Sequence, residues 1–256
     1  MKVASWNLNS VRARKERLLN WLENQGPDLL CLQELKGIEK VFPSSEVAEL
    51  GYHAALYGQP TYNGVAILSR EQGTIKKRGM DDGTDDPQAR LIHVGFANFD
   101  AISVYVPNGS EVGSDKHAYK LQWLERFANY LQKHCDPSKP LLVCGDFNIA
   151  PSSLDVAHPE KWEQSVLCDP KARMLLEKIQ NWGLKDTFRK HHPEGGFYSW
   201  WDYRELAFPK GNGVRIDFVF ATSILMDVCT ASSIDRNERK GKSPSDHAPV
   251  IAEFDY

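Results

Sequence analysis

Short apolar runs recur along this chain and constrain its fold more than any other feature. Most have the length of a strand, four to eight residues, and are rich in Val, Ile and aromatic side chains. The runs span residues 3–6, 29–32, 65–69, 91–94, 101–106, 141–144, 216–221 and 248–254. Helical periods are fewer and are not evenly interleaved with the strands. We therefore expect an α/β fold in which two sheets pack together with helices outside, rather than one doubly wound parallel sheet.

Three segments have the apolar spacing of helices. Residues 11–24 follow Ser10 as a capping residue and end at Gly26 and Pro27, and residues 172–182 end at Gly183. Residues 121–131 show the same spacing. No low-complexity segment or linker divides the chain, so we expect one domain over residues 1–256. Residues 152–169 are polar without a clear period, which predicts a long surface loop, and such loops are often functional.

Composition excludes several classes of protein. Hydrophobic residues make up 41% of the 256 and charged residues 25%, which suits a globular protein with a sizeable core. The net charge of −3 argues against a tight, nonspecific polyanion binder, although it allows a local basic surface. The five cysteines form no CxxC pair, so neither a disulfide framework nor a zinc knuckle is supported. No signal peptide or membrane span is recognisable, and we expect a soluble, cytoplasmic protein.

Polar side chains follow or flank the apolar runs at five places. The stretch "LLVCGDFNIAP" passes from a buried strand to Asp146 and Asn148, which would share a face if the strand continued. The other polar positions are Asn7, Asn9, Glu34, Lys36, Asp217, Asp246 and His247. A turn residue, a solvated charge or a core histidine explains each one singly. Together, however, they have one chemistry, oxygen ligands with a single histidine, and this predicts a shared site.

Oxygen-rich sites select hard cations, so the pattern predicts Mg²⁺ or Mn²⁺ rather than zinc. Glu34 is the best single ligand, with Asn7 beside it. Asp146 would orient or deprotonate the attacking water, and Asn148 would donate to a phosphate oxygen. The number of ions stays open, because these residues suit one-ion and two-ion schemes equally.

His247 would stabilise the charge that develops on the phosphoryl oxygens. Asp246 is a poor partner for it, because neighbouring residues of a strand point to opposite faces. Asp217 has apolar neighbours on both sides, which suggests burial, and a buried carboxylate needs a partner. We therefore expect Asp217 to pair with His247 and to favour the imidazolium form.

Eight motifs in order resemble those of the exonuclease III family of DNA repair nucleases, within the endonuclease/exonuclease/phosphatase superfamily. They are "SWNLN", "LCLQELK", "NGVAILS", "YVPNG", "CGDFNIAP", "YSWWDYR", "RIDFVFA" and "PSDHAPV". The motifs "LCLQELK" and "YSWWDYR" narrow the resemblance from the superfamily to its DNA repair branch. The resemblance covers nearly the whole chain. It implies a four-layer α/β sandwich of two packed mixed sheets flanked by helices, and a Mg²⁺ or Mn²⁺ cofactor.

The resemblance also implies an activity and a set of residues. Family activities are 3′→5′ exonuclease, removal of 3′-blocking groups and incision beside abasic sites, all on duplex DNA. The implied metal site consists of Asn7, Glu34, Asp146, Asn148, Asp246 and His247, and the implied catalytic group of Tyr105, Asp146, Asn148, Asp217 and His247. The implied DNA-binding residues are Asn9, Lys36, Asn63, Arg90, Asn108, Trp200, Trp201, Arg204 and Val214. Trp200, Trp201 and Val214 would wall a sugar pocket, although one of the two adjacent rings is expected in the core. We expect a monomer.

One stretch departs from the family pattern. Members that incise abasic DNA show a small residue and then Phe after the long loop, whereas "SVLCDPKAR" places Leu167 and Cys168 there. A branched side chain would obstruct the entry of an extrahelical abasic sugar. We therefore predict that 3′-end trimming and 3′-phosphate removal exceed abasic-site incision. The alternative is a neutral repacking of the loop.

Two other functions remain open at this point. One is a phosphatase of the same superfamily that acts on a small phospho-ester. The other is a DNA-binding module that kept the fold without catalysis, although this predicts broken catalytic positions and every motif position is filled.

Overall fold

The computed structural model describes residues 1–256 and contains two six-stranded sheets. The first sheet has the order β11-β12-β1-β2-β4-β3, and the second β5-β6-β7-β8-β10-β9. The strands of the first sheet are β1 (Lys2–Asn7), β2 (Leu29–Gln33), β3 (His53–Tyr57), β4 (Val65–Ser69), β11 (Cys229–Ile234) and β12 (Val250–Phe254). Those of the second are β5 (Thr74–Arg78), β6 (Leu91–Gly95), β7 (Asp100–Tyr105), β8 (Leu141–Asp146), β9 (Lys185–Asp186) and β10 (Asp217–Ala221). The pairs β1–β2 and β7–β8 are parallel and the other pairs antiparallel, so both sheets are mixed.

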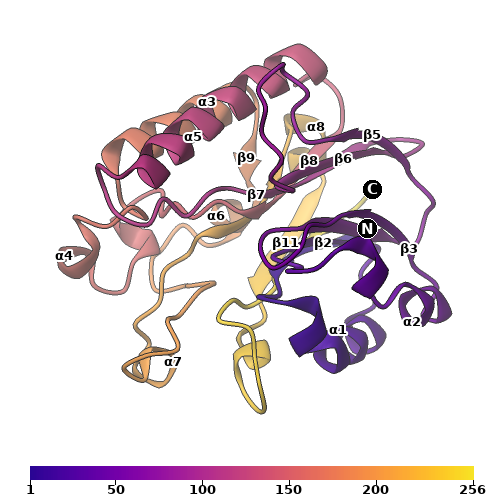
Figure 1. Ribbon diagram of the computed structural model, residues 1–256, viewed down its shortest axis with the longest axis horizontal. Coiled ribbons are helices and arrows are strands. Elements are labelled where there is room, and N and C mark those ends of the chain that lie inside the picture. The colour runs from indigo at the N-terminus through magenta and orange to yellow at the C-terminus, as the bar shows by residue number, and fades with distance from the viewer.

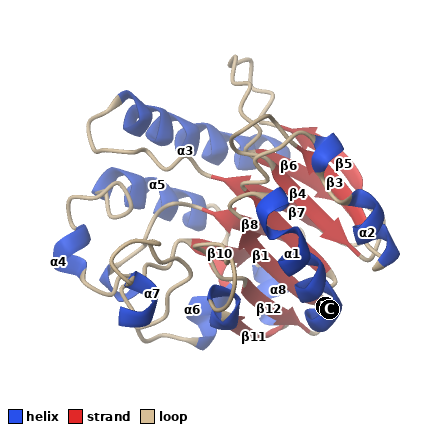
Figure 2. Cartoon of the chain, turned by 60° about the horizontal axis from the view of Figure 1, so that its bottom comes forward, coloured by secondary structure: helices blue, strands red, loops and turns tan.

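Helices cover the outer face of each sheet (Figures 1 and 2). Helices α1 (Val11–Gln25) and α2 (Ser44–Glu49) lie on the first sheet, and α3 (Asp115–His134) and α5 (Pro170–Asn181) on the second. The shorter elements are η1 (Glu39–Val41), η2 (Ser153–Asp155), α4 (Pro159–Trp162), α6 (Thr187–His191), α7 (Ala207–Lys210), α8 (Ser223–Asp227) and η3 (Arg236–Arg239). The predicted four-layer α/β sandwich is confirmed.

All three predicted helices are present, although α3 extends beyond the predicted residues 121–131, and capping residues explain where α1 and α5 begin. Ser10 accepts a hydrogen bond from the N–H of Ala13, and α1 ends at Gly26, whose φ of 53° suits glycine. Asp169 caps α5 in the same way, with Pro170 in the first turn, where its missing N–H is harmless. None of the helices combines the length and the apolar character that crossing a bilayer requires.

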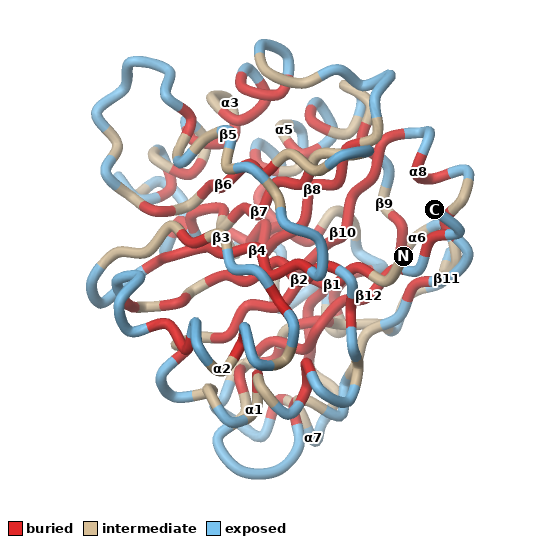
Figure 3. The backbone as a smooth tube through the Cα atoms, turned by 90° about the vertical axis from the view of Figure 1, so that its right-hand side faces the viewer, coloured by how far each residue is buried: buried red, intermediate tan, exposed pale blue.

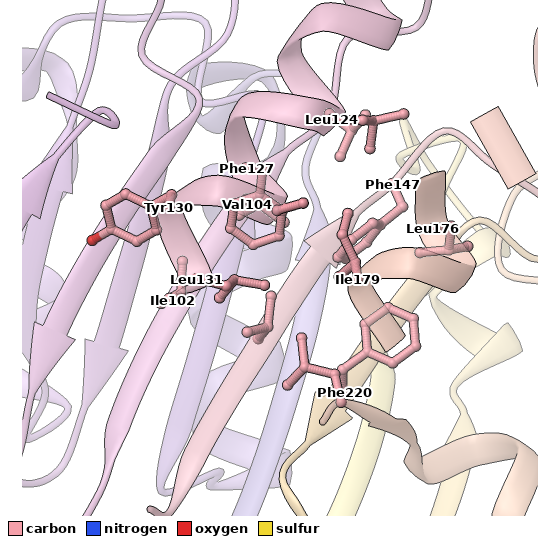
Figure 4. Close-up of a cluster of buried hydrophobic side chains, with 14 of the residues drawn as sticks. Ile102, Val104, Leu124, Phe127, Tyr130, Leu131, Phe147, Leu176, Ile179 and Phe220 are labelled. Carbon is pink, nitrogen blue, oxygen red and sulfur yellow. The ribbon is translucent and has the colours of Figure 1, made fainter. Parts of the chain in front are cut away.

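Alternation along the strands produces three apolar layers, one between the two sheets and one between each sheet and its helices. The outward side chains of β7, β8 and β10 pack under α3 and α5 together with Phe147, which follows β8; Figure 4 shows Ile102, Val104, Phe147 and Phe220. The inward side chains of both sheets form a central core, which contains Val3, Cys31, Cys144 and Val219. Figure 3 shows these central strands as the buried part of the chain. At one end of the strands the inward positions become polar, and the site lies there.

Edge strands and one loop differ from the sequence prediction. Strands β3, β5, β9 and β11 were not expected, because edge strands such as β5 (TIKKR) carry many exposed polar residues and show no apolar run. Residues 152–169 are not simply a surface loop, since they contain η2 and α4. Val166, Leu167 and Cys168 are buried in an apolar cluster with Val214 and Ile216. This burial was hidden by the polar composition of the stretch.

Candidate active site

Strand register brings the polar residues of the second sheet together. Asp146 at the end of β8 pairs with Tyr105 of the parallel strand β7 on one side and with Asp217 of the antiparallel strand β10 on the other. Residues paired across strands share a face, and this face points toward the first sheet. In the first sheet, β1 and β2 are parallel, and Asn7 pairs with Gln33, the residue before Glu34. Side chains distant in sequence therefore meet at one end of the sandwich.

Glu34, Asp146 and His247 form a group whose ligand atoms lie within 4.8 Å of one another. Asn7 holds the two carboxylates, since its Nδ2 donates to Glu34 Oε1 at 2.8 Å and to Asp146 Oδ2 at 2.9 Å. The backbone N–H of Asn9 donates to Asn7 Oδ1 at 2.9 Å, which fixes this orientation. Asn7 was expected to offer its oxygen to the metal, but the amide nitrogen faces the carboxylates. The side chain is thus placed as a bridge.

His247 is held by the partner expected from the sequence. Its Nδ1 lies 2.9 Å from Asp217 Oδ2, and Asp217 also accepts a hydrogen bond from Ser199 Oγ at 2.6 Å. Its Nε2 lies 3.7 Å from Asp146 Oδ2. Burial acts to lower the pKa of His247, but the Asp217 and Asp146 carboxylates outweigh it and raise that pKa to about 10. The ring is therefore an imidazolium at neutral pH.

Burial raises the pKa of Asp146 to about 7, and Asp217 adds to this effect while His247 opposes it. A carboxyl group with a pKa near neutrality is suited to accept and release a proton. Asp246 has a different environment, because Asn9 Nδ2 and Trp200 Nε1 donate to it at 2.8 and 3.0 Å. Burial acts to raise the pKa of Asp246, but His247 and these two donors hold it below its ordinary value. Asp246 belongs to the site, yet lies outside the group of Glu34, Asp146 and His247.

Asn148 reaches the site by a turn rather than by strand alternation. Strand β8 ends at Asp146, and Asn148 has a left-handed φ of 50°. Its backbone N–H donates to Asp146 Oδ1 at 2.9 Å, and its Nδ2 donates to the carbonyl of Val106 at 3.0 Å. Asn108 Nδ2 donates to Asn148 Oδ1 at 2.9 Å. The amide oxygen thus accepts one hydrogen bond and keeps a second lone pair, and metal ligation by Asn148 stays a prediction.

Left-handed backbone conformations gather at the site. Asn9, Glu34, Lys36, Asn63 and Asn148 all have φ between 50° and 55°, a region that side-chain-bearing residues rarely adopt. Such conformations cost free energy and persist where the surrounding structure holds them, commonly at functional sites. Lys36 also reaches the site, because its Nζ lies 2.8 Å from Glu34 Oε2 and donates to Asn9 Oδ1.

Tyr105 keeps its proton. Burial raises its pKa well above the ordinary value, and the carboxylates of Glu34 and Asp146 act in the same direction. The guanidinium of Arg90 lies 4.7 Å from the centre of the Tyr105 ring and donates to its carbonyl. Arg90 and Asn63 line a hollow of about 520 Å³. Tyr105, Asn108 and Ser110 line both this hollow and a neighbouring one that contains Glu34, Asp146 and His247.

The titratable groups share a hollow of about 510 Å³ with an apolar wall. Trp162, Leu167, Trp200 and Ile216 contribute to this wall. The rings of Trp162 and Trp200 meet edge to face, with their centres 5.7 Å apart. Sequence reasoning missed Trp162, for which the only signal was a large aromatic residue inside a polar stretch. Arg204 lies at the rim, is highly exposed and pairs with Asp202.

Two expected pocket residues do not reach the hollow. Trp201 has no exposed surface, and its ring packs on Phe208 with the ring centres 5.1 Å apart. This is the alternation of neighbouring side chains that placed one of the two rings in the core. Val214 is also fully buried, in the cluster that contains Ala150 and Cys168. The expectation that Trp201 and Val214 wall the pocket is corrected accordingly.

Comparison with known proteins identifies relatives over the whole chain. Residues 4–247 match the family described as "Endonuclease/Exonuclease/phosphatase family". Exodeoxyribonuclease III of Haemophilus influenzae is 34% identical over 266 residues, which cover 99% of this chain and 100% of the relative.

Solved structures agree with this assignment. An AP endonuclease from Archaeoglobus fulgidus superposes with a TM-score of 0.96 at 39% identity. A 3′ phosphatase from Neisseria bound to a product DNA hairpin superposes with a TM-score of 0.96 at 37% identity. Both alignments cover 100% of this chain and 100% of the other. The chain therefore belongs to the exonuclease III family of DNA repair nucleases, a branch of the endonuclease/exonuclease/phosphatase superfamily.

Proposed function

We propose that this enzyme hydrolyses phosphodiester and phosphomonoester bonds at the 3′ ends of duplex DNA, with Mg²⁺ or Mn²⁺ as cofactor. The observation that carries the proposal is the hollow that Glu34, Asp146 and His247 line together with an apolar wall that contains Leu167. The charged groups suit a phosphate, and the apolar wall suits a deoxyribose. The solved Neisseria relative, a 3′ phosphatase bound to product DNA, supports this choice of substrate.

The donor set fits a hard cation. Glu34 and Asp146 offer carboxylate oxygens, and Mg²⁺ commonly takes one or two carboxylates from a protein. An imidazolium has no lone pair for a metal, so His247 is assigned to the phosphate rather than to the ion. When bound, the ion would polarise the phosphoryl group and lower the pKa of a bound water.

The protein groups have separate parts in the reaction. Asp146 orients or deprotonates the attacking water. His247 donates hydrogen bonds to the phosphoryl oxygens on which negative charge develops, and Asp217 keeps it charged and oriented. Tyr105 offers a protonated phenol beside them. Asn7 holds the spacing of the two carboxylates.

Leu167 is the reason for assigning 3′ ends rather than internal abasic sites as the main substrate. It lies in the wall with Trp162 and Trp200, and its branched side chain occupies a position at which abasic-incising relatives are expected to have a small residue. A terminal nucleotide has no chain continuing beyond it and needs less room than an extrahelical abasic sugar. We accordingly propose that abasic-site incision is the slower activity, and that one nuclease domain acts as a monomer.

A panel of labelled duplexes tests the assignment. A 3′-recessed end, a 3′-phosphate and an internal abasic site are incubated with the enzyme in Mg²⁺, with and without EDTA. We expect 3′-phosphate removal and 3′-end trimming to be faster than incision, and all three to stop in EDTA. Faster abasic incision contradicts the 3′-end assignment, and activity only on small phospho-esters contradicts DNA as the substrate.

A further inference from the structure

Lys120 of α3 is a fully buried lysine whose ammonium group contacts three backbone carbonyls. Its Nζ donates to the carbonyl oxygens of Val166 and Asn148, each at 2.7 Å, and to that of Asn108 at 3.1 Å. Lys120 takes part in no ion pair, since its hydrogen-bond partners are all backbone carbonyls. An ammonium group has three donors, and here each has a carbonyl acceptor.

The three carbonyls belong to three separate segments that border the active-site hollow. Asn108 lies between β7 and α3, Asn148 follows β8, and Val166 lies between α4 and α5. Near this point, the Asn108 side chain donates to that of Asn148, and Leu167 follows Val166 directly. Gly109 fits tightly on the lysine stem, because a Cβ at that position would lie 3.0 Å from Lys120 Cδ. Lys120 is thus a common attachment for both amides and for the apolar wall.

Packing alone does not explain a lysine at this position. The neighbouring inward residues of α3, Trp123, Leu124 and Phe127, fill the core with apolar side chains. Burying a cation without a carboxylate is costly, and burial lowers the pKa of Lys120 to about 7, although Asp146 and Asp169 act in the opposite direction. An apolar side chain would fill the space without this cost, but it would leave three carbonyls without a donor.

We propose that Lys120 is a positioning residue for hydrolysis, which fastens the segments of Asn108, Asn148 and Val166 so that the two amides and the Leu167 wall keep their places around the phosphate. The inference rests on the proposed function, because it takes the hollow that these segments border as the place where the phosphate reacts. Glu34 belongs to the other sheet and receives no contact from Lys120, whereas Asp146 is linked to Lys120 through Asn148, whose backbone N–H donates to Asp146 Oδ1.

The first test replaces the ammonium while keeping the length of the side chain. Lys120→Met is compared with Lys133→Met, an exposed position of the same helix, on a duplex with a 3′-phosphate. Thermal unfolding is measured first, and kinetics are taken well below the transition. We expect kcat to fall about 10- to 100-fold, because a displacement of about 1 Å at a reacting group has this effect. The KM should stay within about twofold, as should all parameters of the control.

A double-mutant cycle with Asn148→Ala separates positioning from general weakening. If Lys120 acts through Asn148, the double variant is little slower than Asn148→Ala alone. Fully additive losses, or a folded Lys120→Met enzyme with kcat within twofold of the parent, overturn the inference. If Asn148→Ala itself retains normal kcat, the proposed role of that amide fails instead.

Lys120→Arg is the second variant and serves if Lys120→Met does not fold. The planar guanidinium of arginine keeps the charge and has N–H donors, but its geometry does not allow it to donate to all three carbonyls as the ammonium group does. We expect a kcat between those of the parent and Lys120→Met, again with a KM within about twofold of the parent. Parental kcat in the arginine variant contradicts the three-carbonyl arrangement as the relevant feature.

Discussion

Asp217 of β10 lies directly opposite Asp146 of β8 in the antiparallel ladder, so two carboxyl groups share one buried face of the second sheet. Two neighbouring buried negative charges repel each other. His247 relieves this repulsion, because its Nδ1 contacts Asp217 while its Nε2 lies near Asp146. The three groups therefore form one electrostatic unit, and removing one member changes the others.

The pH dependence of stability follows from this unit. His247 has a folded-state pKa of about 10, above its ordinary value of 6.5. The stabilisation is therefore fully present below about pH 6.5 and is lost as the pH rises through about 10. We expect Asp217→Asn to lower the free energy of unfolding by about 3–5 kcal/mol at pH 6, as breaking a buried pair does. By pH 10 the cost should be clearly smaller.

Urea unfolding of the EDTA-treated protein at pH 6, 8 and 10 measures this effect. Asp227→Asn, at an exposed position of α8, is the matched control and should change stability little at any of these pH values. A cost of Asp217→Asn that does not vary with pH argues against an imidazolium at position 247.

Glu34 tests the assignment of the metal site through activity. Glu34→Gln keeps the shape of the side chain but removes the charge that a hard cation requires. We expect 3′-phosphatase turnover to fall by about two orders of magnitude or more, comparable with the loss of a major electrostatic contact. Glu49→Gln on the surface of α2 provides the control. Near-normal turnover of Glu34→Gln at saturating Mg²⁺ shows that another group is the principal ligand.

Leu167 and Cys168 test the substrate preference as a pair. Leu167 faces the active-site hollow, whereas Cys168 faces a separate hollow with Pro159 and Arg173. Leu167→Ala should raise the ratio of abasic incision to 3′-phosphate removal severalfold, at a cost of about 2–5 kcal/mol in stability. Cys168→Ala should leave the ratio unchanged. An equal ratio in all three proteins means that Leu167 only repacks the loop.

The adjacent tryptophans should respond differently to the same substitution. Trp200 lines the hollow and donates to Asp246, so Trp200→Ala is expected to raise KM and lower kcat. Trp201 is buried against Phe208, so Trp201→Ala should cost about 3–5 kcal/mol in stability and leave the kinetics of the folded fraction near those of the parent. Thermal unfolding and steady-state kinetics on both variants distinguish the two roles. A substrate defect specific to folded Trp201→Ala contradicts this division.

The central strands and the convergence of the site were predictable because each depends on local pattern. Apolar runs mark strands buried on both faces, and their polar ends, such as Glu34 and Asp146, meet once two sheets pack. The edge strands were not predictable, since a strand like β5 presents exposed lysines and no apolar run. The family resemblance predicted the four-layer sandwich and the metal cofactor. Strand alternation predicted that one of the two rings of Trp200 and Trp201 lies in the core.

Side-chain orientation lies beyond what the sequence carries. The residue type of Asn7 is compatible with metal ligation, but the N–H of Asn9 turns its oxygen away from the carboxylates. Asn148 was placed by strand alternation, yet it arrives through a left-handed turn after the strand has ended. Trp162 and Lys120 were missed because their positions depend on contacts between segments remote in sequence. Val214 was placed at the pocket by resemblance, and packing buries it instead.

Binding of Mn²⁺ to the EDTA-stripped protein, followed by electron paramagnetic resonance, tests the central claim that Glu34 and Asp146 form a site for a divalent cation. The account predicts saturable binding by the parent protein, competition by Mg²⁺, and affinity reduced about 10-fold or more in Glu34→Gln. Equal Mn²⁺ affinity in the parent and in Glu34→Gln would contradict it.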